Sequence, residues 1–137
     1  MRRVIPLSLV IALATVACDN SSSTSVATSP SPLTTETFSG TVAVGSSDFH
    51  TFTATQGGTV SVTLNAAGPP ATIFMGLGIG TPSTSTCALL SGATADTQAG
   101  TTSQLSGTVD AGTYCVEVYD VGNETIPVNY SVTVAHP

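Results

Sequence analysis

Apolar and polar residues alternate strictly along residues 112–119, and this pattern predicts the clearest β-strand of the chain. Tyr114, Val116 and Val118 share one parity, and Cys115 has the other. Because successive side chains of a strand point to opposite faces, we expect the first three to line a core. Cys115 is then expected to face outward, where it needs a partner.

The same period of two recurs from residue 36 onward, between clusters of glycine, proline and serine that are typical of turns. The pattern predicts a short strand around Cys87 and Leu89, and further strands over residues 38–44, 48–54, 59–65, 71–78, 103–109, 113–120 and 128–134. Residues 92–100 are small and polar, and we expect a loop there. About eight strands without a helix favour an all-β fold, an antiparallel two-sheet sandwich resembling a jelly roll.

One predicted strand has a glycine-lined face. Three glycines share one parity, opposite an apolar row: Gly76, Gly78 and Gly80. Glycine in a strand often marks close approach, so this row can admit a neighbouring ring or a flat ligand. With the outward aromatic residues Phe49 and Tyr119 it forms a candidate contact surface, and a loosely packed sheet edge is the alternative.

The distribution of charge excludes one class of partner. The chain has 2 Lys and Arg residues against 8 Asp and Glu residues, and both positive residues, Arg2 and Arg3, lie at its start. Nucleic-acid binding needs Lys and Arg to replace counterions, so we expect no nucleic-acid partner. A phosphate site built on Lys or Arg is excluded for the same reason.

The first residues have the pattern of an export signal. A basic head is followed by the apolar residues 4–16, too short a run for a permanent membrane-spanning helix. Residues 14–18 resemble the lipobox of bacterial lipoproteins, in which a small residue precedes a cysteine that becomes lipidated. The resemblance implies a signal peptide over residues 1–17 and lipidation of Cys18, with localisation at the bacterial cell membrane or outer membrane. An ordinary cleaved signal and an uncleaved anchor are the alternatives.

A tether separates the predicted anchor from the predicted domain. Of residues 19–35, 12 of 17 are Ser, Thr or Pro, a composition that cannot bury enough apolar surface to fold. We therefore assign residues 18–35 to the lipidated cysteine and a flexible tether, and residues 36–137 to the β-sandwich.

The cysteine count supports this arrangement. Lipidation of Cys18 would leave Cys87 and Cys115 as an even pair in an oxidising compartment. We expect a disulfide between them, which would stabilise the domain by roughly 3–4 kcal/mol in the chain-entropy model. A metal site or a reactive thiol is the alternative, and each would need further groups that the sequence does not identify.

Several segments in order resemble the bacterial pre-peptidase C-terminal domain family. They are a Gly-Thr strand at residues 38–42, an Asp-aromatic strand at 48–54, and the strands at 111–118 and 130–134. The resemblance spans residues 36–134. It implies a jelly-roll-like, non-catalytic sandwich of the kind appended to exported enzymes, some members of which bind polymers such as collagen or polysaccharide.

Two histidines are candidates for chemistry. Asp48 and His50 share one strand face and could form half of a set that activates a serine nucleophile. The chain lacks the Gly-x-Ser-x-Gly pattern, however, so we expect His50 to be a packed or rim side chain and expect no catalytic residue. His136 is expected to lie at a frayed end of the chain and to be inert.

A loop near residue 120 has three oxygen-bearing side chains, those of Asp120, Asn123 and Glu124. They form a candidate weak divalent-cation site, although calcium takes six to eight oxygens and a solvated turn is the simpler interpretation. We expect no resident cofactor.

Together these patterns predict an exported, membrane-anchored lipoprotein that displays a non-catalytic β-sandwich. Its role would be binding or accessory, toward a surface polymer, a glycan or a protein. A structural envelope protein without a specific ligand is the alternative, and a hydrolase is a more distant one.

Overall fold

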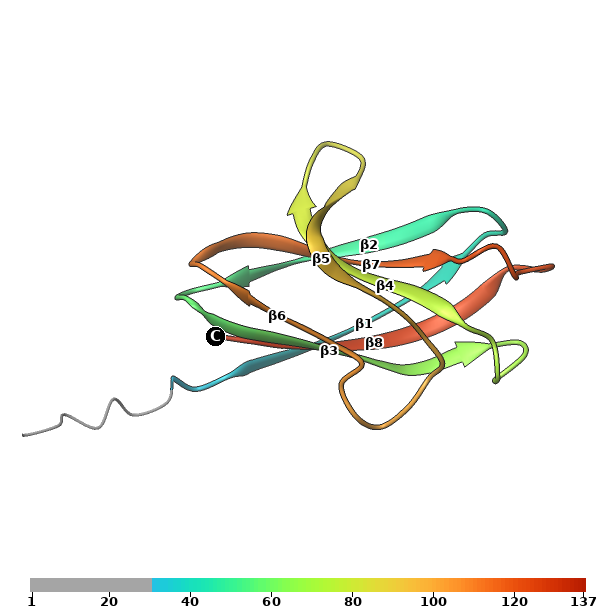
Figure 1. The fold of residues 1–137 in the computed structure, drawn as a ribbon, viewed down its shortest axis with the longest axis horizontal. Helices are drawn as coiled ribbons and strands as arrows, with labels where there is room; N and C mark the ends of the chain where they lie inside the picture. The colour runs from blue at the N-terminus through green and yellow to red at the C-terminus, as the bar shows by residue number, and fades with distance from the viewer. Residues whose placement is uncertain (1–30) are drawn as a thin grey trace, which may run out of the picture.

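The computed structural model describes residues 31–137 and shows a β-sandwich (Figure 1). These residues form eight strands and no helix: β1 Thr34–Val42, β2 Ser47–Ala54, β3 Gly58–Gly68, β4 Met75–Pro82, β5 Cys87–Thr97, β6 Leu105–Val109, β7 Gly112–Asp120 and β8 Val128–His136. The predicted signal peptide, Cys18 and most of the predicted tether lie outside the described residues. No helix in the described part of the chain is long and apolar enough to cross a membrane.

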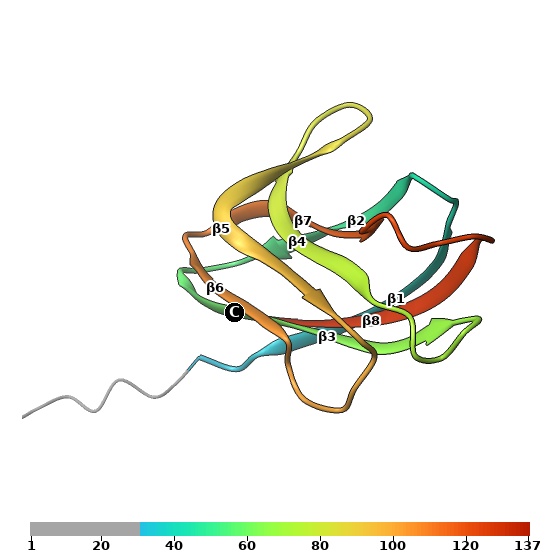
Figure 2. The ribbon, with the colours of Figure 1, turned by 45° about the vertical axis from the view of Figure 1, so that its right-hand side comes forward.

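The strands form two antiparallel four-stranded sheets with a jelly-roll order. One sheet runs β1-β8-β3-β6 and the other runs β2-β7-β4-β5. The pairs β1–β8, β2–β7, β3–β6 and β4–β5 are those of one long antiparallel hairpin rolled onto itself. The predicted fold class is therefore confirmed, and the two layers are visible in Figures 1 and 2.

The core lies between the sheets, where the alternating apolar rows meet. The inward residues Val60, Val62 and Leu64 of β3 are fully buried, as are Val116 of β7 and Leu77 of β4. Burying a side chain of this size stabilises the fold by about 1.5–3 kcal/mol relative to leaving it exposed. The predicted parity of these strands is confirmed.

Three predicted boundaries are wrong by several residues. β1 begins at Thr34 rather than at residue 38, so the last two residues of the predicted tether belong to the sheet. The other two differences lie in the β4–β5 hairpin. The fourth strand begins at Met75 rather than at residue 71, because residues 69–74 form the turn in which Ile73 N–H donates to Pro70 O. The expected loop at 92–100 is largely the second half of β5. Its inward residues, Ala93 and Ala95, are too small to give a strong apolar alternation.

The β4–β5 pairing contains a bulge that the alternation of apolar and polar residues did not predict. Gly80 pairs with Leu89, yet Gly78 pairs with Thr94, so β5 bulges between these two positions. Gly92 within the bulge has a φ of 74°, a conformation that favours glycine. The twisted hairpin extends beyond the two sheets at its tip (Figure 2).

The register also fixes the two ends of the sandwich. Thr34 pairs with His136, so the start of β1 and the end of β8 lie together at what we call the proximal end. Val42 pairs with Val128 at the other end of this ladder. The loops 43–46, 69–74 and 121–127 lie at that opposite end, which we call the distal end (Figure 1).

Candidate functional site

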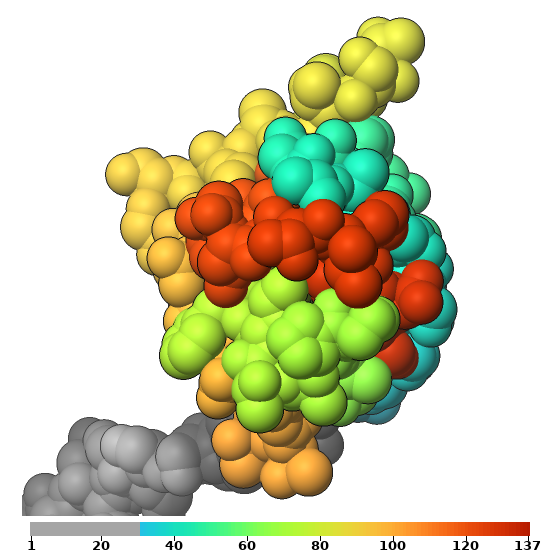
Figure 3. Space-filling view, turned by 90° about the vertical axis from the view of Figure 1, so that its right-hand side faces the viewer, coloured from blue at the N-terminus to red at the C-terminus, as the bar shows by residue number. Residues whose placement is uncertain are grey.

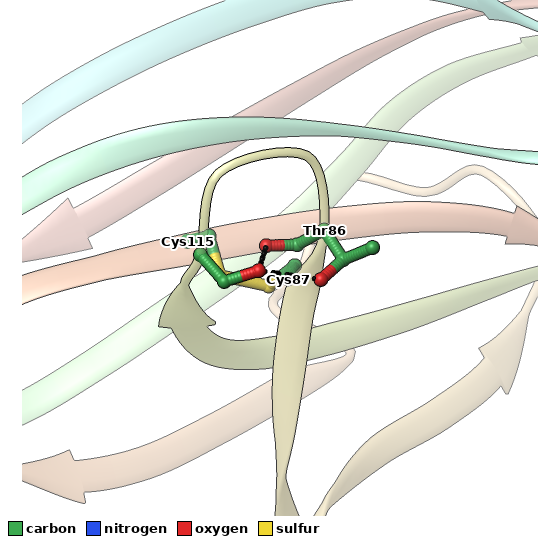
Figure 4. The surroundings of a disulfide bond; sticks show 4 residues. Thr86, Cys87 and Cys115 are labelled. Atoms are coloured by element: carbon green, nitrogen blue, oxygen red, sulfur yellow. Dashed lines mark hydrogen bonds between the residues drawn. A yellow bond between two sulfur atoms is a disulfide. The ribbon is translucent and has the colours of Figure 1, made fainter.

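The predicted disulfide is confirmed. Cys87, at the start of β5, is bonded to Cys115 in the middle of β7, with their Cα atoms 5.9 Å apart. Figure 4 shows the bridge beside Thr86, whose hydroxyl lies 2.7 Å from the Ser83 hydroxyl in the hairpin tip. Cys87 pairs with Pro82 next to the hairpin turn, so the bridge fixes the turn end of the β4–β5 hairpin to the middle of its sheet.

The glycine row of β4 explains how this bridge fits. β4 lies between β7 and β5 in the sheet, so the link from Cys115 to Cys87 must pass over it. Gly80 is the residue at the crossing, where a Cβ atom would come 2.9 Å from Cys87 Sγ and would also collide with the backbone of Ala88. Glycine is required here because of close approach, as the sequence suggested for this row.

The other two glycines are covered by side chains of the same chain. A Cβ atom at Gly76 would collide with the ring of Tyr119, and one at Gly78 would collide with the side chain of Leu89. The neighbouring ring that the pattern anticipated is thus Tyr119 itself, and all three glycines of the row are buried or nearly so. Burial, followed by the charges of Asp96 and Glu117, raises the pKa of the Tyr119 hydroxyl.

The face around this row retains only partial exposure. Phe49 and Tyr119 are half-buried on neighbouring strands of the same sheet, Phe49 opposite Glu117 and Tyr119 opposite Ser47. The described residues form no pocket here or elsewhere. The glycines are therefore not open to a flat ligand, although the two aromatic edges remain accessible.

Asp120 organises the distal loops through its carboxylate. Its Oδ2 accepts a hydrogen bond from Gly45 N–H at 2.8 Å, and its Oδ1 accepts from Gly122 N–H at 2.7 Å. The N–H groups of Asn123 and Glu124 also donate to Oδ1, at 3.0 and 3.2 Å. These bonds, that from Gly45 foremost, lower the pKa of Asp120 against the opposing effect of burial.

Glu124 lies in the following loop, and its carboxylate has no hydrogen-bond partner. The residue is only 6% exposed, and both of its carboxylate oxygens are buried without a hydrogen bond. Burial, followed by the negative charge of Asp120, raises its pKa. Asn123, the third residue of the predicted divalent site, is exposed and contacts Asp120 through its backbone.

A second polar cluster lies between the edge strands β1 and β2. The hydroxyl of Tyr130 donates to Asp48 Oδ2 at 2.7 Å, and His50 Nε2 lies 2.9 Å from the same hydroxyl oxygen. Because the hydroxyl hydrogen goes to Asp48, His50 Nε2–H is the donor in the second bond. Burial, followed by the hydrogen bond and the charge of Asp48, raises the pKa of Tyr130.

Packing around this cluster supports the interpretation of His50 as a rim side chain. Its ring stacks on Phe38 of β1 with centroids 4.8 Å apart. The absence of a side chain at Gly40 makes space for the polar groups of this cluster. A Cβ atom there would lie 2.7 Å from Tyr130 Oη. The ring nitrogen that could have activated a nucleophile is hydrogen-bonded to Tyr130.

The expectation that His136 lies at a frayed end of the chain is wrong. It lies within β8 rather than at a frayed end, is 3% exposed, and its Nε2 lies 2.9 Å from Glu36 Oε1. Its ring also packs against Phe52, at a centroid distance of 5.1 Å. The reason is the β1–β8 pairing, which covers the last residues of the chain with the first strand.

Apolar side chains are exposed together at the distal end, a feature that no sequence pattern indicated. Val44, Phe74, Val121 and Ile126 are four of the seven large apolar residues that are exposed within residues 31–137. Phe74 and Val121 adjoin the paired residues Met75 and Asp120, so they lie side by side. Figure 3 shows the turquoise, red and light-green loop segments meeting in one continuous surface. We call these four residues the distal apolar patch.

No family model matches the chain, and no curated protein matches it in sequence. The similarity of residues 36–134 to the pre-peptidase C-terminal domain family therefore stays a prediction. The likeness of residues 14–18 to a lipobox, and the lipidation of Cys18 that it implies, stay predictions as well.

Proposed function

We propose that the protein is an exported lipoprotein, anchored through Cys18, that displays a non-catalytic β-sandwich as a binding module. The observation that carries the binding role is the distal apolar patch. Val44 and Ile126 are 52% and 50% exposed on separate loops. Large apolar side chains that are exposed together at one end of a domain often mark a contact surface.

The chemistry of the patch favours a protein partner over a glycan. Three of its four side chains, those of Val44, Val121 and Ile126, are aliphatic. Sugar rings are commonly recognised by aromatic platforms, of which the patch offers one, Phe74. Nucleic acid is disfavoured, because no Lys or Arg occurs after Arg3.

The position of the patch fits the proposed anchor. β1 begins at Thr34, at the proximal end, and the patch lies at the other end of the sandwich. A tether running from a lipidated Cys18 would hold the domain by its proximal end and leave the patch facing away from the membrane. Asp120 supports the patch by bonding loop 43–46 to loop 121–127.

Photocrosslinking in the bacterium of origin tests this proposal. A photoreactive phenylalanine analogue at Val44 or Ile126 of the full-length protein should give a discrete heavier product. The same analogue at Asp110, an exposed residue of the proximal β6–β7 turn, is the matched control and should give none. The product should disappear when the three patch positions not bearing the probe are changed to serine.

The outcomes separate the competing interpretations. A product with twice the mass of the chain would indicate self-association instead. Equal products, or none, at the two ends would contradict the binding module and favour a structural envelope protein without a specific ligand.

A further inference from the structure

Glu124 presents an electrostatic problem that the described residues do not solve. A carboxylate that is buried without a partner is strongly disfavoured, so it must either take up a proton or meet a cation. Residues 31–137 contain no Lys or Arg, and both histidines have other contacts, His136 with Glu36 and His50 with Tyr130. No positive side chain of the described residues is therefore near enough to neutralise Glu124.

Protonation would answer only part of this problem. A proton on one oxygen removes the charge, but the resulting hydroxyl needs an acceptor, and both Glu124 oxygens lack any hydrogen-bond partner. A cation can contact both oxygens of a carboxylate at once. It would also relieve the repulsion between Glu124 and Asp120, which contributes to the raised pKa of Glu124.

We propose that Asp120, the last residue of β7, and Glu124, in loop 121–127, bind one divalent cation between them. Glu124 supplies two free oxygens, whereas Asp120 supplies Oδ2, which accepts only the Gly45 N–H and keeps a lone pair. No group of three His, Cys, Asp or Glu side chains capable of holding a metal occurs in the described residues, so the remaining ligands are neutral oxygens and water.

The chemical class of the cation follows from these ligands. All are oxygens, which suit hard cations, and an irregular set on a loop suits calcium better than magnesium, which demands near-octahedral geometry. Two carboxylates make a weak site, one that is filled at the millimolar calcium levels typical outside the cytoplasm. This inference does not rest on the proposed binding role.

Thermal unfolding of the full-length protein in detergent tests the site. At pH 7, calcium at about ten times its Kd should raise the Tm by roughly 5–10 °C over the protein in EDTA. Glu124→Gln should abolish the rise, whereas Asp110→Asn, at the opposite end, should keep it. Sodium chloride of matched ionic strength controls for screening of the acidic surface.

A second measurement locates the cation without a variant. In NMR spectra of the wild-type protein, Mn²⁺ in place of calcium should broaden the backbone amide signals of Gly45, Gly122 and Asn123, and spare that of Asp110. An unchanged Tm in 10 mM calcium, a full rise in Glu124→Gln, or uniform broadening by Mn²⁺ would each overturn the proposal. If Glu124→Gln does not fold, the Mn²⁺ result decides.

Discussion

Two carboxylates four residues apart have opposite environments. Asp120 accepts four backbone N–H groups, which lower its pKa, whereas Glu124 is buried without a partner and its pKa is raised. A lowered pKa means that ionised Asp120 favours the folded state. A raised pKa means that ionised Glu124 opposes it.

These shifts predict how stability depends on pH in the absence of calcium. The contribution of Asp120 is present above its unfolded pKa and should be lost as the pH falls through its lower folded pKa. Glu124 should act in the other direction, because stability falls as the pH rises from its unfolded pKa to its higher folded pKa. Urea unfolding between pH 3 and 7 in EDTA measures both effects.

Two variants separate the contributions. Asp120→Asn should flatten the loss of stability on the acid side, and Glu124→Gln should flatten the decline toward neutral pH. Unchanged pH profiles in both variants would mean that neither carboxylate is perturbed by folding.

At the scale of elements, the alternation of side chains predicted the strands that have large apolar residues. Val60, Val62 and Leu64 defined β3 because each contributes a branched side chain to the core. The second half of β5 was not predicted, because Ala93 and Ala95 pack against the core with little more than a methyl group. Periodicity identifies a strand only when its inward residues differ clearly from its outward ones.

The candidate sites were predictable only where they are local or covalent. The disulfide was predicted because an even pair of cysteines remains once Cys18 is assigned to lipidation. The Asp120 loop was predicted because three oxygen-bearing side chains lie close together in the sequence. The pairing of Tyr130 with Asp48 joins residues 82 positions apart, and the bond from Gly45 to Asp120 joins residues 75 apart. No sequence pattern indicated either contact, because both depend on the jelly-roll strand order.

The glycine row of β4 leads to a prediction about this element. Gly80→Ala should destabilise the protein by about 2 kcal/mol or more, because the new methyl group meets the backbone of Ala88 and the Cys87 sulfur. Gly107→Ala in β6 is the matched control. Its nearest neighbour would be Ile79 Cδ1 at 3.8 Å, an ordinary contact, so it should be neutral or slightly stabilising.

Urea midpoints of the two glycine variants, with the disulfide intact, provide the measurement. Equal stability of Gly80→Ala and Gly107→Ala would show that the crossing at Gly80 has room for a side chain.

At the scale of the whole molecule, the fixed charges are almost all negative. All acidic residues except Asp19 lie in the described part of the chain, which has no Lys or Arg. Such a surface repels itself, and salt screens this repulsion over a Debye length of about 10 Å at 0.1 M. The Tm should therefore rise between about 10 mM and 0.5 M sodium chloride.

Neutralising one surface carboxylate should reduce this effect. Asp110→Asn removes an exposed charge and should show a smaller rise in Tm with salt than the wild type. A Tm that is independent of sodium chloride would show that self-repulsion does not influence stability.

The pairing of the first strand with the last has a mechanical consequence. β1 runs beside β8 from Thr34↔His136 to Val42↔Val128, so a pull on the chain before Thr34 acts along the strand. Under a load between the two ends of the sandwich, the hydrogen bonds of this ladder would be sheared together rather than unzipped one at a time. The domain would then resist mechanical unfolding most strongly when the force acts in the direction in which an anchor would pull it.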